Sequence, residues 1–249
     1  MGRRRIGAYD ADQPGSKILA QVAPSALPHF TAVPLFQCLA PSEQALLAPL
    51  CRVRVYDKGA TIFEEGDQAA DLSFVVLGRV KIVKAAQGRD VILGLFGPGE
   101  PIGAVATFEE RAYPATAVAL EPSTILQVPE RELFGVIEAH PEITRRLLQG
   151  LMLRQIEITS RLADLTGPVE YRIGRLFLTL GGRVGKRTEA GLDIPLALSR
   201  QEIADLAATT IETAIRVMSR WGKEGLVLTR ADGFTIPDVA ALERRIAEI

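Results

Sequence analysis

The chain is poor in the residues that build disulfide frameworks and metal centres. It has two cysteines, Cys38 and Cys51, and two histidines, His29 and His140, in 249 residues. Two cysteines are too few for a disulfide framework and fit a reducing compartment. One such chain also lacks the four thiolates of an iron–sulfur cluster, and we expect no metal centre. No Ser/His/Asp set, metal-ligand spacing or P-loop glycine pattern indicates an enzyme.

Long apolar runs are missing too, and neither sign of charge is in excess. No run reaches the length of about 20 apolar residues that a membrane span needs. The basic start at Arg3–Arg5 is not followed by an apolar signal core, so we expect a cytoplasmic protein with no membrane partner. The formal net charge is −1, which neither indicates nor excludes nucleic acid as a partner. If the chain binds DNA, its positive charge must be concentrated locally.

The first half of the chain divides into an arm and a β-rich region. Residues 1–30 mix Gly, Pro, Ser and Arg without periodicity, which predicts a flexible N-terminal arm. Within residues 31–140, short β-type runs are separated by turns such as Glu65-Gly66-Asp67 and Gly97-Pro98-Gly99. Many short strands with glycine turns predict an antiparallel sandwich or barrel.

A long helix is predicted over residues 141–166. Pro141 suits a first helical position, and nothing breaks the pattern before Gly167. An amphipathic helix packed on its own domain is the simpler interpretation. A helix of about 24 residues spans roughly 36 Å, which favours an interface between two chains, although Arg154 and Arg161 interrupt a strict heptad. The side chains expected at this interface are Leu147, Leu151, Ile158 and Leu162.

Residues 167–249 carry the sharpest local pattern. Ser199 and Glu202 form a capping box, which predicts the start of a helix. The small residues of 207–209 then predict a tight turn, and Thr210 suits the cap of a second helix. A hairpin with an Asp232-Gly233 turn follows. These features predict a helix-turn-helix followed by a hairpin.

The second helix has a core face and an exposed face. Glu212 and Arg216 share the exposed face, where arginine can read guanine and glutamate can accept from cytosine. A surface ion pair is the simpler alternative. Ile211 and Ile215 offer apolar contact to a thymine methyl group. The core-facing residues are Ala214, Val217, Met218 and Trp221, and the expected phosphate contacts are Thr209, Thr210, Arg200, Arg220 and Lys223.

These motifs together resemble the CRP/FNR family of bacterial transcription regulators. The resemblance covers about residues 31–240. The matching segments are Lys58-Gly59, Glu65-Gly66-Asp67, Val76–Val80, Gly97–Gly103, Ser199–Ala204 and the pair Glu212 and Arg216. The resemblance implies an α+β protein with a β-roll sensor domain at 31–140, a dimerisation helix at 141–166 and a winged-helix DNA-binding domain at 167–249. It also implies a homodimer on an inverted repeat, with RNA polymerase as a partner if the protein is an activator.

The sequence departs from the cyclic-nucleotide binders of this family. They carry Gly-Glu for the ribose and Arg-Ser or Arg-Thr for the phosphate, whereas this chain has Ala104 in place of the glutamate and Pro114-Ala115 in place of the second pair. Losing the cation removes a charge-assisted contact to phosphate, so we do not expect control by cyclic AMP in the usual manner. Arg111 is the substitute cation to consider. The candidate pocket for an unknown small-molecule effector comprises Gly103, Ala104, Val105, Arg111 and Thr116.

Other sensing chemistries stay open at this point. No cofactor is predicted, and haem bound by a histidine or cysteine is the alternative. Cys38 and Cys51 lie in apolar segments, which is typical of ordinary buried cysteines rather than of a redox switch. The alternative function is a regulatory β-roll protein that senses haem or a gas, redox state or another small molecule and acts through protein contacts rather than DNA.

Overall fold

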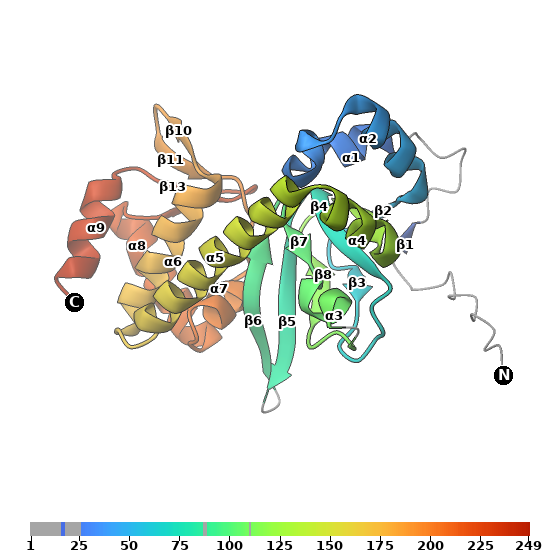
Figure 1. The fold of residues 1–249 in the computed structure, drawn as a ribbon. Helices are drawn as coiled ribbons and strands as arrows, with labels where there is room; N and C mark the ends of the chain where they lie inside the picture. Colours follow the sequence, from blue (N-terminus) through green and yellow to red (C-terminus); the bar gives the residue numbers. More distant parts are fainter. Residues whose placement is uncertain (1–15, 18–25, 87–88, 110) are drawn as a thin grey trace. The chain divides into compact units, whose positions relative to one another are not determined.

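The computed structural model describes residues 16–17, 26–86, 89–109 and 111–249 (Figure 1). It separates into two compact units, one formed by the chain up to Gly88 with Leu93–Gln149, and one formed by Arg89–Ile92 with Gly150–Ile249. The chain mixes helices with antiparallel sheets, which confirms the predicted α+β class. None of the helices in the described ranges combines the length and apolar character needed to cross a bilayer.

Two antiparallel sheets form the β-roll, which belongs to the first unit except for Arg89–Ile92. The five-stranded sheet has the order β1 (Ser16–Lys17), β2 (Arg52–Tyr56), β9 (Ser123–Pro129), β4 (Asp71–Leu77) and β7 (Pro101–Ile102). The four-stranded sheet has the order β3 (Thr61–Phe63), β8 (Thr116–Ala119), β5 (Val80–Ala86) and β6 (Arg89–Phe96). A buried apolar cluster takes residues from both sheets, including Val75 and Ile125 from one and Phe63 and Val80 from the other. The central strands β4 and β9 are buried almost throughout, because this cluster covers one face of the five-stranded sheet and a second cluster covers the other.

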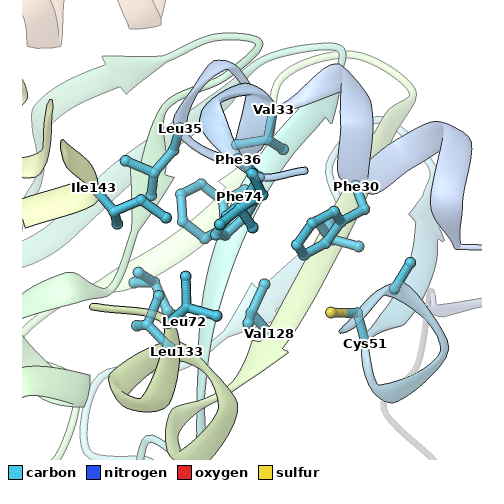
Figure 2. Packing of buried hydrophobic residues seen from close by; sticks show 14 of the residues in the cluster. Phe30, Val33, Leu35, Phe36, Cys51, Leu72, Phe74, Val128, Leu133 and Ile143 are labelled. Carbon is cyan, nitrogen blue, oxygen red and sulfur yellow. The ribbon is translucent and has the colours of Figure 1, made fainter. Parts of the chain in front are cut away.

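Short helices build a second apolar cluster against the five-stranded sheet. These helices are α1 (Leu27–Ala32), η1 (Pro34–Cys38), α2 (Pro41–Leu47), η2 (Ala48–Leu50) and α4 (Glu130–Ala139). Phe30 and Phe36 stack with ring centroids 4.3 Å apart, and Phe36 meets Phe74 of β4 edge to face at 5.2 Å (Figure 2). Leu133 of α4 and Ile143 complete this cluster with no exposed surface. Helix α4 was not predicted.

The predicted end of the N-terminal arm at residue 30 is wrong. Helix α1 begins at Leu27, and Phe30 is 1% exposed. Burying this phenylalanine contributes about 2 kcal/mol, which outweighs the weak helix propensity of the flanking residues. Ser16 and Lys17 pair with β2 in antiparallel register, and the rest of the predicted arm up to residue 25 lies outside the described residues.

Helix α5 (Pro141–Asp164) begins at the predicted proline and runs through both units. Ile143 is fully buried in the first unit, and Leu147 packs against the same cluster. The predicted boundaries at residues 140 and 166 therefore do not match the division between the units, which falls at Gln149 and Gly150. The first turns of α5 belong to the core of the first unit.

The second unit has the architecture of a winged helix. Its elements are α6 (Val169–Val184), β10 (Lys186–Thr188), β11 (Gly191–Ile194), α7 (Arg200–Leu206), α8 (Ile211–Glu224), β12 (Leu228–Thr229), β13 (Phe234–Ile236) and α9 (Val239–Ala247). The strands form one sheet in the order β10-β11-β13-β12. Trp221 is fully buried, and Phe177 meets Phe234 edge to face at 4.9 Å. Helix α9 was not predicted; it buries Leu242 and Ile246 against this core.

Candidate nucleic-acid interface and sensor site

Helices α7 and α8 begin after the predicted N-caps, Ser199 and Thr210. The amide of Glu202 donates to Ser199 Oγ at 3.1 Å, and the amide of Ser199 donates to the Glu202 carboxylate at 2.9 Å. The hydroxyl of Thr210 accepts from the amide of Thr213 at 3.3 Å. Ile203 and Ala207 are buried. The capping box and the short turn of the helix-turn-helix are therefore confirmed.

The turn between these helices holds an alanine in a left-handed conformation. Ala208 has φ +50° and is the one non-glycine residue with positive φ in the described part of the chain. The Arg172 guanidinium donates to the Ala208 carbonyl at 3.0 Å, and the amide of Thr209 donates to Ala204 at 2.9 Å. Arg172 comes from α6, so the turn is braced from outside the motif. This role of Arg172 was not predicted, because nothing in local sequence links it to a residue 36 positions away.

Replacing Ala208 with glycine should stabilise the second unit by about 0.5–1 kcal/mol. A left-handed alanine costs roughly 1–2 kcal/mol relative to glycine, and the greater freedom of glycine in the unfolded chain offsets part of that gain. The measurement is the urea midpoint followed by Trp221, the single tryptophan. Ala240→Gly, at an exposed position in the first turn of α9, is the control and should destabilise by up to about 1 kcal/mol. A lower midpoint for Ala208→Gly would contradict the strained turn.

Helix α8 presents an exposed face with two charged groups and one large apolar side chain. Glu212 and Arg216 are exposed, and Ile215 between them is 48% exposed. Within the described residues Arg216 makes no hydrogen bond or ion pair, so the simpler interpretation of a pair with Glu212 is not observed. Ile211 is partly buried at the start of the helix. The four core-facing residues, Ala214, Val217, Met218 and Trp221, are buried as predicted.

The predicted phosphate contacts divide into exposed groups and groups engaged within the unit. Thr210 and Lys223 are exposed, and Thr209 is partly buried. The Arg200 guanidinium donates to Thr229 Oγ1 at 2.8 Å and lies 6.0 Å from the ring centroid of Phe234.

Arg220 also has a partner within the unit. It forms a close ion pair with Glu170 of α6, which Arg245 of α9 reaches at 3.4 Å. Arg200 and Arg220 thus hold the wing and the helices together, and their contact with phosphate stays a prediction.

The apolar stripe of α5 is exposed over its second half. Leu151 is 58% exposed, Ile158 42% and Leu162 61%, whereas Leu147 is partly buried by the first unit. Leu148 and Met152 lie on the same stripe and are 51% and 64% exposed. Spacing of three or four residues places these side chains on one helical face.

The two arginines that interrupt the heptad have partners within their own chain. Arg154 pairs with Glu157 at 2.7 Å. Arg161 donates to the carbonyls of Ile92 at 2.8 Å and Leu206 at 3.2 Å, both in the second unit, and burial lowers the pKa of its guanidinium. Both side chains thus bind groups of their own chain, although their spacing still places them beside Leu151 and Ile158 on the helix.

Three of the predicted effector residues lie in or beside a short helix, α3 (Ala104–Phe108), and Arg111 and Thr116 follow it in the chain. Gly103 caps it with φ +76°, and a Cβ there would lie 2.5 Å from Cε1 of Tyr113, closer than real Cβ contacts. Val105 is 65% exposed. Thr116 accepts from the amide of Glu65 at 3.0 Å. The glycine thus gives room to the Tyr113 ring.

Cys51 and His140 each contact a group of the first unit. The Cys51 thiol donates weakly to the Leu47 carbonyl at 3.5 Å. Burial, followed by the charges of Asp71 and Glu132, raises the pKa of Cys51 to about 12, so this thiol is protonated and unreactive at neutral pH. His140 Nε2 lies 3.0 Å from a Glu43 carboxylate oxygen. Within the described residues no group of three or more potential ligands is placed to hold a metal ion.

Two family models match the chain. The cyclic nucleotide-binding domain matches residues 53–140, and the Crp-like helix-turn-helix domain matches residues 171–245. The chain belongs to the CRP/FNR family. The first match lies in the β-roll and the second in the winged helix.

Relatives of known identity agree with this membership. The chain is 27% identical over 213 residues to the CRP-like cAMP-activated global transcriptional regulator of Mycobacterium tuberculosis, covering 85% of this chain and 95% of that protein. It is 29% identical over 211 residues to the cyclic AMP receptor protein of Thermus thermophilus, covering 84% and 95%. A solved CRP-family transcriptional regulator from Thermus thermophilus superimposes with a TM-score of 0.67 at 27% identity, covering 78% of this chain and 96% of that one. This CRP/FNR protein is thus similar to transcription regulators, not enzymes.

In this CRP/FNR protein, three positions of the candidate effector segment carry no cation for a cyclic phosphate. A cyclic phosphate is an anion and needs a cation or several donors when it is buried. Ala104, Pro114 and Ala115 bring no charged or hydroxyl group. The substitute cation, Arg111, has a side chain 77% exposed and lies 3.8 Å from Glu109. The substitute is therefore directed to solvent and to a carboxylate.

Proposed function

We propose that this protein is a homodimeric transcription regulator that binds an inverted-repeat DNA site through α8. The single observation that carries the proposal is the exposed face of α8, where Arg216 has no partner among the described residues and Glu212 and Ile215 stand beside it. An arginine without a partner in its own fold is available for two hydrogen bonds to a guanine. RNA polymerase is a further partner if the protein is an activator.

The start of α8 suits insertion into the major groove. Thr210 caps the helix, and Glu212 lies in its first turn. Recognition helices of helix-turn-helix proteins contact bases with their N-terminal residues. Lys223, in the last turn of the same helix, is exposed and suits a phosphate contact that carries no sequence information.

A homodimer formed through α5 explains why the proposed DNA site is an inverted repeat. Exposed leucine and isoleucine side chains form a stripe on α5, and contiguous apolar surface of this kind marks a site of association. Two-fold symmetry then places two copies of α8 on two half-sites about one helical turn apart. We propose that no cyclic nucleotide and no haem is needed for this binding, although the two relatives described above are named for cyclic AMP.

Selection from random double-stranded DNA tests this function. The full-length wild-type protein, without added nucleotide, should enrich an inverted repeat with a G·C pair at the inner position of each half-site and half-site centres about 10–11 base pairs apart. Ile215→Ala should keep the inner pair and lose a preference for thymine at a neighbouring position, because the alanine methyl makes less contact with the thymine methyl.

The opposite result has a defined meaning. If no sequence is enriched, the protein does not read DNA in this way. An absorption spectrum of the purified protein with a haem band, together with the absence of enrichment, would support the alternative of a haem-sensing β-roll protein that acts through protein contacts.

A further inference from the structure

Phe63 and Tyr113 form a stacked aromatic pair inside the β-roll. Their ring centroids are 3.8 Å apart with planes at 11°, and the residues are 6% and 8% exposed. Both belong to the apolar cluster shared by the two sheets. Phe63 comes from β3, whereas Tyr113 comes from the loop between α3 and β8. A loop side chain thus serves as a core residue.

This loop is tied down on both sides of the tyrosine. The amide of Tyr113 donates to the Asp67 carbonyl at 2.8 Å, and the amide of Gly66 donates to the Tyr113 carbonyl at 2.9 Å. The ammonium group of Lys84 donates to the Pro114 carbonyl at 2.6 Å and to the Glu65 carboxylate at 2.9 Å. The turn after β3 and the strand β5 therefore hold the ring in place.

Side chains of the β-roll fill the space in front of Gly103 and neutralise the charge of Lys84. The Tyr113 ring fills the space in front of Gly103, where a Cβ would meet its Cε1 atom at 2.5 Å. Lys84, the cation nearest to the loop by its hydrogen bonds, is neutralised by Glu65. An anionic ligand would have to displace an aromatic ring from an apolar cluster and a carboxylate from its lysine.

We propose that the Tyr113 ring, fastened by Lys84, is a built-in occupant of the β-roll, so that this sensor domain keeps its arrangement without a small-molecule effector and admits no cyclic nucleotide. The inference rests on the proposed function for its consequence, which is DNA binding independent of cyclic nucleotides. Its physical basis, the packing of Tyr113, lies in the β-roll alone. Its test therefore uses thermal melting of the full chain and does not depend on DNA.

Removing the ring and returning it as a free molecule tests the proposal. Tyr113→Ala should lower the melting temperature by about 10 °C, since emptying an aromatic core position leaves a cavity. An apolar cavity of this size binds small aromatic molecules, so millimolar p-cresol should recover several degrees in the variant and leave the wild type unchanged. Tyr113→Phe, which keeps the ring, should melt within about 2 °C of the wild type. Cyclic AMP and cyclic GMP at 1 mM, a probe concentration of about 1,000 times a micromolar Kd, should shift neither protein.

Tyr171→Ala is the matched control. Tyr171 also packs against a glycine, Gly167, but is only partly buried, so its loss should leave no enclosed cavity and no rescue by p-cresol. If Tyr113→Ala does not fold, Tyr113→Val with phenol replaces it, because valine keeps part of the apolar volume. A cyclic nucleotide that raises the melting temperature of the wild type by several degrees would overturn the proposal. So would a Tyr113→Ala variant that melts like the wild type, or one that p-cresol leaves unchanged.

Discussion

Replacing Leu151 and Ile158 together with glutamate should convert the proposed dimer into a folded monomer. In the single chain these side chains are 58% and 42% exposed, so their loss removes little from the core of either unit. Burying a large apolar side chain contributes about 1.5–3 kcal/mol. Four half-exposed side chains in a two-fold dimer therefore contribute roughly 3–6 kcal/mol, and the Kd of the dimer should rise about 10²–10⁴-fold. The charge of the glutamates adds to this loss.

Sedimentation velocity over a range of concentrations measures the change. Circular dichroism of the same samples must show unchanged helix content. Leu153→Glu is the matched control, because Leu153 is 69% exposed on the same helix but lies off the stripe by its spacing. The control should remain dimeric. A double variant that is folded and still dimeric at micromolar concentration would show that α5 is not the interface.

Helix α5 also shows which features periodicity can predict. Pro141 and the apolar spacing predict its start and its stripe, because both depend on neighbours within two turns. The directions of Arg154 and Arg161 were not predictable in this way. Arg161 binds the carbonyls of Ile92 and Leu206, and a backbone carbonyl leaves no mark in the sequence. Sequence spacing therefore shows that these arginines adjoin the stripe, but not which groups they bind.

The sensor unit marks a second limit of sequence interpretation. Ala104, Pro114 and Ala115 lack the charged and hydroxyl groups that cyclic-nucleotide binders of the family carry at these positions, and this difference is evident from the sequence alone. The proposed role of Tyr113 could not be predicted from the sequence. Tyr113 and its stacking partner, Phe63 of β3, lie 50 residues apart in the chain and meet only in the fold. The same holds for the pair formed by Lys84 and Glu65.

The winged helix was predictable for the reason that its signals are local. The cap at Ser199, the cap at Thr210 and the turn at Asp232-Gly233 each involve residues three or fewer positions apart. Arg220 shows the opposite case: it lies on the predicted DNA-binding helix, yet its guanidinium pairs with Glu170 of α6. Position on a helix predicts which face a side chain occupies but not whether that side chain pairs with a residue of another element.

Arg216 differs from Arg220 in having no partner among the described residues. Arg216→Ala should weaken binding to the selected site by about 1–3 kcal/mol per half-site and relax the preference for guanine at the inner position. Arg216→Lys should lose most of the same preference, because an ammonium group cannot form the two parallel hydrogen bonds of a guanidinium.

Two controls on the same helix separate base reading from charge and from stability. Lys223→Ala should weaken binding to all sequences alike and reduce the slope of log affinity against log salt by about one per half-site. Arg220→Ala should instead lower the urea midpoint of the second unit, since it leaves Glu170 with only the 3.4 Å contact of Arg245. Fluorescence anisotropy with the selected site and with a site mutated at the guanine measures DNA binding of all four variants, and urea unfolding measures the stability of the Arg220 variant. If Arg216→Ala retains both its affinity and its preference for guanine, the exposed face of α8 does not read this base, and the partner of Arg216 must be sought elsewhere.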